Sequence, residues 1–107
     1  TLLKECREII LPRIRPEADH VFHLYVVQSP QRSELISFLQ SKGVAPGVHY
    51  PVPIHLQPAY KDRLRQSNSM MITESLSNRV ISLPLYPELD EALQQKVVQA
   101  VLGFQYV

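Results

Sequence analysis

The chain has 107 residues, a length that suits one domain with its own apolar core. It is 45% hydrophobic and 20% charged, which argues against disorder, and its net charge of +1 offers no basic surface for nucleic acid or an anionic membrane. The sequence contains no apolar run of about 20 residues and no signal pattern in its first residues, so we expect a cytoplasmic protein. The single cysteine, Cys6, is expected to be a small buried or half-buried residue in a reducing compartment.

Two stretches in the first part of the chain have the composition of strands. Residues 7–11 are predicted to form a strand or strand-like entry, and residues 20–28 form the clearest strand because they are rich in Val, Phe and Tyr. Alternation along residues 20–28 places Phe22, Leu24 and Val26 on one face. This face is wholly apolar, so it is expected to pack on the core.

A helix is predicted from Ser29 and Pro30 to Gln40, because serine caps helix N-termini and proline suits the first turn. Gly43 is expected to end it, since glycine tolerates the left-handed conformation found after many helices. Residues 44–48 are predicted to form a short return strand. The expected buried stripe of the helix consists of Leu35, Ile36, Leu39 and Phe38.

Residues 49–58 contain three prolines in ten positions and are predicted to be stiff and irregular. Prolines reduce the entropy lost on ordering, so the polar side chains between them would be preorganised for recognising a small molecule. The alternative, which composition by itself favours, is that the prolines only steer the chain between two elements. The polar side chains in question are His49, Tyr50, His55 and Gln57.

The last third of the chain is predicted to contain two helices around a short strand. Residues 61–69 are polar and predicted to form a mobile loop, with Lys61 to Arg65 solvated. A helix over 71–79 is expected to bury Ile72, Leu76 and Val80. A strand over 80–83 and a helix over 90–102 follow, with Asp90 as the helix cap. The apolar residues at helical spacing in and just after that helix are Leu93, Val97, Ala100, Val101 and Phe104.

Sequence motifs for catalysis or metal binding are missing from the chain. His20 and His23 would face opposite sides of a strand, and His49 and His55 do not match zinc-ligand spacing. The sequence has no glycine-rich phosphate loop, nucleophile elbow or kinase signature. We therefore predict no metal site and no catalytic residue.

Three segments in this order resemble a known series: His-Val-Phe-His-Leu-Tyr-Val-Val over 20–27, Gly-Val-His-Tyr-Pro-Val-Pro-Ile-His-Leu-Gln-Pro-Ala-Tyr over 47–60, and Ser-Leu-Pro-Leu-Tyr-Pro-Glu-Leu over 82–89. Together they resemble the C-terminal part of the DegT/StrS-type nucleotide-sugar aminotransferases, which use pyridoxal phosphate. The resemblance covers about residues 18–104.

The resemblance implies an α+β fold, with a short antiparallel sheet covered by helices, as in the small domain of a fold-type I pyridoxal-phosphate-dependent transferase. Residues 1–107 would form this single domain and close one side of a substrate cleft. His49 is implied as the best contact with the sugar, with Tyr50 and His55 next. The block from Ser82 to Pro87 is expected to shape the backbone rather than touch substrate.

The chain departs from the family in lacking the cofactor domain. Its four lysines are not in the family's lysine motif, and neither Asp19 nor Asp62 stands in the motif for the acid opposite the pyridine nitrogen. The resemblance thus implies a fragment of a homodimeric enzyme that moves an amino group from glutamate to a keto-sugar nucleotide. Pyridoxal phosphate would bind the full-length enzyme through its N-terminal cofactor domain, and this chain alone would bind none and be inactive.

Two other interpretations stay open from the sequence. The first is a free-standing, non-catalytic relative of this domain that binds a sugar nucleotide or a protein. The second is a small unrelated enzyme that uses His49 or His55 as a general base, which the absence of a partnering nucleophile disfavours. A fragment is also expected to expose the apolar face that meets the cofactor domain.

Overall fold

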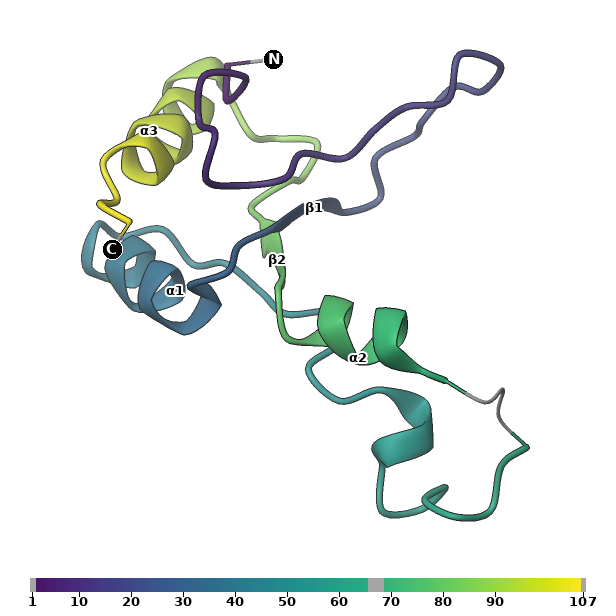
Figure 1. Cartoon of the computed structure of the whole chain (residues 1–107). Helices are drawn as coiled ribbons and strands as arrows, with labels where there is room; N and C mark the ends of the chain where they lie inside the picture. The colour runs from purple at the N-terminus through teal and green to yellow at the C-terminus, as the bar shows by residue number, and fades with distance from the viewer. Residues whose placement is uncertain (1, 66–68, 107) are drawn as a thin grey trace.

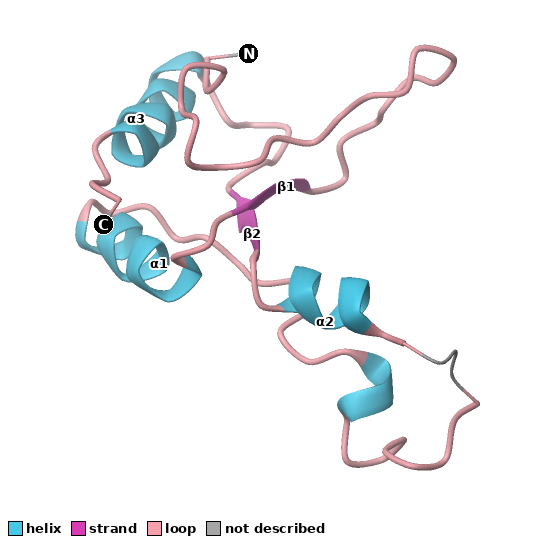
Figure 2. Cartoon of the chain, viewed as in Figure 1, coloured by secondary structure: helices cyan, strands magenta, loops and turns pink. Residues whose placement is uncertain are grey.

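The fold is a small two-stranded sheet with helices around it, seen in a computed structural model that describes residues 2–65 and 69–106 (Figure 1). The elements follow in the order β1 (Tyr25–Gln28), α1 (Arg32–Ser41), the 3-10 helix η1 (Ile54–Leu56), α2 (Met71–Ser77), β2 (Val80–Leu83) and α3 (Glu91–Leu102). Figure 2 shows how much of the chain between these elements is irregular. The predicted α+β class is confirmed. None of the helices in the described ranges is long and apolar enough to cross a bilayer.

The sheet is antiparallel, and all four stretches predicted as strands contribute to it. β1 and β2 pair with Val27 opposite Ile81 and Val26 opposite Ser82. Residues 7–11 and 44–48 add only single bridges, Ile10 to Gln28 on one edge and Gly47 to Ser82 on the other. The sheet therefore has two regular strands in the middle and an irregular segment along each edge.

The core lies on the face of the sheet that carries Val27 and Ile81, both fully buried, and Tyr25 packs against it. The prediction that Phe22, Leu24 and Val26 form the core face is wrong. Phe22 has a φ of 49°, which interrupts the extended conformation, so β1 begins only at Tyr25 and the alternation predicted from residue 20 does not operate. Helices α1 and α3 add Leu35, Leu39, Val98 and Val101 to the core. The core is completed by residues outside these helices, namely Leu3, Cys6, Ile9, Val44 and Leu83.

Two of the predicted helix-end signals are confirmed, whereas α1 begins later than predicted. The Asp90 side chain accepts a hydrogen bond from the Leu93 amide at 2.8 Å, so the predicted cap of α3 is confirmed. Gly43 has a φ of 75° after α1, as expected for a helix stop. Ser29 does not cap α1, because the helix begins at Arg32; the Ser29 hydroxyl instead accepts from the Gln31 amide at 3.2 Å.

Helix α2 does not bury its apolar side chains. Ile72 is 78% exposed, Leu76 is also exposed, and Val80 is half-buried, so the predicted buried stripe is wrong. The reason is visible in Figure 1, where α2 and the segment after residue 50 extend away from the core. Residues 61–65 are exposed and lack helix and strand, as predicted, whereas residues 66–68 of the predicted loop lie outside the described residues.

We call residues 50–65 and 69–77 the apolar arm. Its base is attached to the core by hydrogen bonds, since the Arg32 guanidinium donates to the Ser77 carbonyl and the Ser29 amide donates to the Arg79 carbonyl. The radius of gyration is 15.6 Å. A compact chain of this length would have about 13 Å. The difference is consistent with Figure 1, in which the arm and residues 12–24 project from the core.

Cys6 is buried, as expected, and this leads to a prediction on alkaline stability. Burial raises the pKa of the Cys6 thiol above its ordinary value. As the pH rises past about 8.5, the unfolded chain loses this proton before the folded chain does. The free energy of unfolding should then fall, by at most about 1.4 kcal/mol per pH unit for this group.

The measurement is urea unfolding over a series of alkaline pH values. A Cys6→Ala variant is the control, because burial also raises the pKa of Tyr106, which destabilises in the same direction. The fall should be smaller in the variant, and identical pH profiles for the two proteins would contradict the assignment to Cys6.

Candidate substrate-contact site

His49 lies beside β2, at the edge of the sheet. The chain from Gly47 runs antiparallel to β2, with the Gly47 amide donating to the Ser82 carbonyl at 2.9 Å and the Ser82 amide donating to the Gly47 carbonyl at 2.8 Å. The His49 ring turns back along this pair, and its Nδ1 atom is 2.9 Å from the Ser82 hydroxyl oxygen. His49 as a whole is exposed, whereas Ser82 is buried.

Tyr50 follows directly and is 74% exposed. The peptide bond between His49 and Tyr50 is cis. The two rings meet edge to face, with centroids 5.6 Å apart and an interplanar angle of 87°. His49 and Tyr50 therefore form one aromatic and polar pair at the surface, where the chain leaves the sheet and enters the apolar arm.

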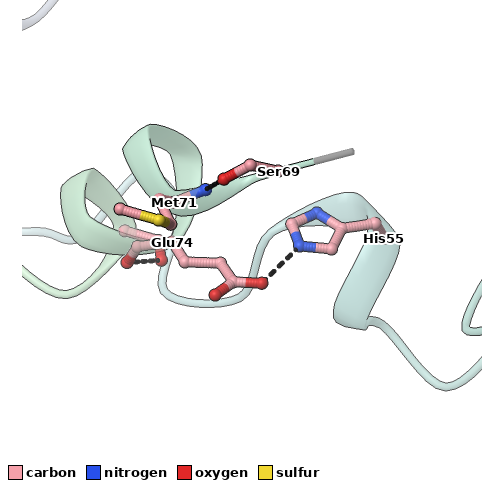
Figure 3. A network of polar contacts seen from close by, with 5 residues as sticks. His55, Ser69, Met71 and Glu74 are labelled. Atoms are coloured by element: carbon pink, nitrogen blue, oxygen red, sulfur yellow. Dashed lines mark hydrogen bonds and ion pairs between the residues drawn. The ribbon is translucent and has the colours of Figure 1, made fainter. Parts of the chain in front are cut away.

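His55 has a different environment, shown in Figure 3. It lies in η1 and is only 7% exposed, and its Nε2 atom is 2.9 Å from Oε1 of Glu74 in α2. The structure thus brings His49 and Tyr50 together, while His55 is turned toward α2. Gln57, the other polar residue of this segment, donates to the Val52 carbonyl at 3.4 Å.

A groove of about 530 Å³ runs beside His49, between the segment after Gly43 and the segment after Ser82. Most of its walls are apolar, and it has polar side chains at its edges. Ser82, Tyr86 and Lys96 at these edges were not among the site residues predicted from the sequence. Ser82 and Tyr86 belong to the motif from Ser82 to Pro87, which could have indicated both. The polar lining residues are His49, Ser82, Tyr86 and Lys96.

The described residues do not fit pyridoxal phosphate. Its site in an aminotransferase needs a lysine that reaches the cofactor inside the cleft, together with an acid opposite the pyridine nitrogen. All four lysines are exposed; Lys42 lies over the Phe38 ring at 5.3 Å. Lys96 lines the groove next to Gly43, but the residues that line the groove with it include no Asp or Glu that could face a pyridine nitrogen. Residues 2–65 and 69–106 also contain no group of three His, Cys, Asp or Glu side chains that could hold a metal ion.

A sequence model of the DegT/DnrJ/EryC1/StrS aminotransferase family matches residues 1–102. The chain belongs to this family. It is 40% identical over 91 residues to the dTDP-3-amino-3,4,6-trideoxy-alpha-D-glucose transaminase of Streptomyces venezuelae, a match that covers 85% of this chain and 24% of that protein. It is 36% identical over 96 residues to the pleiotropic regulatory protein of Geobacillus stearothermophilus, covering 90% of this chain and 26% of that protein.

The crystal structure of DesV, also from S. venezuelae, has the same fold over this region. Its TM-score to the present structure is 0.88 at 38% sequence identity, and the match covers 94% of this chain and 27% of that one. The chain therefore spans about a quarter of the length of these members of the DegT/DnrJ/EryC1/StrS family.

Proposed function

We propose that this chain is the C-terminal small domain of a longer, homodimeric aminotransferase that uses pyridoxal phosphate to move an amino group from glutamate to a keto-sugar nucleotide. The observation that carries the proposal is the pattern of coverage: nearly all of this chain matches about a quarter of the length of relatives such as the S. venezuelae transaminase. In the proposal, the lysine and the acid that hold the cofactor belong to the remainder of the longer protein.

The apolar arm supports a role in a larger assembly. Met71 and Ile72 are 74% and 78% exposed, and Tyr50 and Ile54 on the other segment of the arm are also largely exposed. Apolar side chains gathered on one projecting segment are typical of a surface that another part of a protein covers. We propose that the N-terminal cofactor domain covers this face, so that the arm and His49 border a common cleft.

The residues of this chain would then bind and orient substrate rather than react with it. His49 offers its Nε2 atom, which has no recorded partner among the described residues, to a polar group of the sugar. Tyr50 presents an exposed ring and hydroxyl next to it. His55 would support substrate binding indirectly, because its hydrogen bond to Glu74 holds the two segments of the apolar arm together. The apolar walls of the groove would exclude water from this side of the cleft.

The test of this function has two arms. The isolated chain, supplied with pyridoxal phosphate, glutamate and a dTDP-linked keto-sugar, is expected to form no amino-sugar, and borohydride is expected to trap no cofactor on any one lysine. A chimera in which this chain replaces the matched segment of the S. venezuelae transaminase is expected to aminate the dTDP-sugar.

The two arms can each contradict the proposal. Amino transfer by the isolated chain would show that the cofactor residues are present in these 107 residues. A chimera that folds and takes up cofactor but transfers no amino group would show that this chain is not the equivalent domain. The unmodified S. venezuelae enzyme is the control for the assay.

A further inference from the structure

We propose that Ser82 is a positioning residue: together with Gly47, it holds the imidazole of His49 in one orientation and leaves the Nε2 atom for a ligand. The inference rests on the proposed function for its purpose, since His49 is taken as the contact to the sugar. The orientation of the ring itself is a property of this chain and can be tested without any substrate.

Ser82 is well placed to fix another side chain because it is itself immobile. It lies in β2 between two neighbours, pairing with Val26 of β1 on one side and with Gly47 on the other. It is 4% exposed. Its amide and carbonyl both bond to Gly47, and its hydroxyl reaches His49 Nδ1 at 2.9 Å. Three hydrogen bonds from one buried residue thus connect β2 to the three-residue segment 47–49.

Gly47 provides the second constraint. Side chains two residues apart on an extended segment share a face, so the His49 ring folds back over Gly47 on the way to Ser82. A Cβ atom added at Gly47 would lie 2.9 Å from Cε1 of His49 and 3.5 Å from Nδ1. The ring therefore occupies the space that a side chain at position 47 would need, and any residue other than glycine would displace it.

These two contacts leave one polar atom of the ring available. Nδ1 is hydrogen-bonded to the Ser82 hydroxyl, and His49 as a whole is exposed, so Nε2 is the ring nitrogen left for a sugar hydroxyl or phosphate oxygen. A ring that is already ordered loses less rotational freedom on binding. The sequence predicted that the block from Ser82 to Pro87 shapes the backbone. In addition, the Ser82 side chain orients the His49 ring.

The test begins with the 107-residue chain as it is, by nuclear magnetic resonance of the histidine rings. In the wild-type chain, the His49 Hε1 proton should show a cross-peak to the Gly47 Hα protons, and its ring nitrogens should report one tautomer. A His49→Gln variant assigns the signals. In Ser82→Ala the cross-peak should weaken and the two tautomers should average, while Ser82→Thr, which keeps the hydroxyl, should restore the wild-type pattern.

Gly47→Ala provides a test that leaves the serine intact. The added methyl should displace the ring and abolish the single-tautomer pattern. Ser77→Ala is the matched control, since Ser77 is also a buried serine, at 8% exposed, and its hydroxyl donates to the Glu74 carbonyl, away from His49. It should leave the His49 signals unchanged. Unchanged His49 signals in both Ser82→Ala and Gly47→Ala would overturn the positioning role.

A titration with a dTDP-sugar connects the positioning to binding. The ligand should shift the His49 signals of the wild-type chain, and Ser82→Ala should weaken the affinity by about threefold to tenfold, the usual effect of losing one hydrogen bond. If the wild-type chain shows no response while the ring signals behave as above, the positioning stands and the proposed substrate fails. If Ser82→Ala binds as well as wild type despite a released ring, the positioning has no role in binding and the inference fails.

Discussion

Replacing Leu35 by alanine is expected to lower the free energy of unfolding by about 2–5 kcal/mol, because it leaves a cavity in the core. Leu35 lies on α1, is fully buried and packs in the cluster that includes Val27 and Ile81 of the sheet. Domains of this size have a total stability of about 5–15 kcal/mol, so this single change should remove a large part of it. Urea unfolding followed by circular dichroism measures the loss.

The matched control is Ile72→Ala on α2. It removes an aliphatic side chain of the same size from a helix, but Ile72 is 78% exposed. The expected change in the free energy of unfolding is about 0.5 kcal/mol or less. Equal losses for Leu35→Ala and Ile72→Ala would mean that the arm is packed against the core of the isolated chain, contrary to the structure.

The second large effect is expected at the contact between His55 and Glu74, which connects the two segments of the apolar arm. In Glu74→Ala the Nε2 atom of the buried His55 loses its partner at 2.9 Å. An unsatisfied buried polar group costs about 1–3 kcal/mol. Because the pair lies in the projecting arm and not in the core, the cost should appear as local opening of the arm.

Hydrogen exchange measures this opening. The amides of Leu56 and Gln57 donate to the carbonyls of Pro53 and Ile54, so their exchange reports on η1. In Glu74→Ala it should accelerate by about 5-fold to 150-fold, the equivalent of the lost interaction. The amide of Val44, which donates to the Leu39 carbonyl beside the core, should keep its protection.

Glu34→Ala is the control for the helix itself. Glu34 is an acidic residue in the first turn of α1, as Glu74 is in the first turn of α2, so both substitutions remove a favourable charge near a helix N-terminus. Only Glu74→Ala should open η1. Similar exchange at Leu56 in the two variants would mean that the contact with His55 does not hold the arm.

Some local features were predictable because their causes lie within a few residues. Asp90 caps α3 by bonding to an amide three positions on, and Gly43 ends α1 by adopting a positive φ. The strand over 80–83 and the buried pair Leu35 and Leu39 follow from short patterns of the same kind. The recognition role of residues 49–58 stays a prediction, since composition by itself favours a segment that only connects two elements.

The face of β1 that packs on the core could not be predicted in this way. Residues 20–28 carry apolar side chains on both faces, so alternation by itself leaves the choice to the partners. The left-handed conformation of Phe22 shortens the strand, and Val27 meets Ile81 of β2. The burial of α2 could not be predicted for a similar reason. Its apolar spacing leads to burial only where the fold brings the helix against a core.

For the candidate site as well, the sequence indicated the residues but not their partners. The sequence by itself determined which residues are available, namely His49, Tyr50 and His55 in a stiff segment, and it determined the family through the order of its motifs. Only the tertiary structure decided that His49 bonds to Ser82, 33 positions away, and that His55 turns to Glu74, 19 positions away. The physical reason is that helix caps and turns arise from neighbours along the chain, whereas burial and the partner of a side chain depend on which distant segments the fold brings into contact.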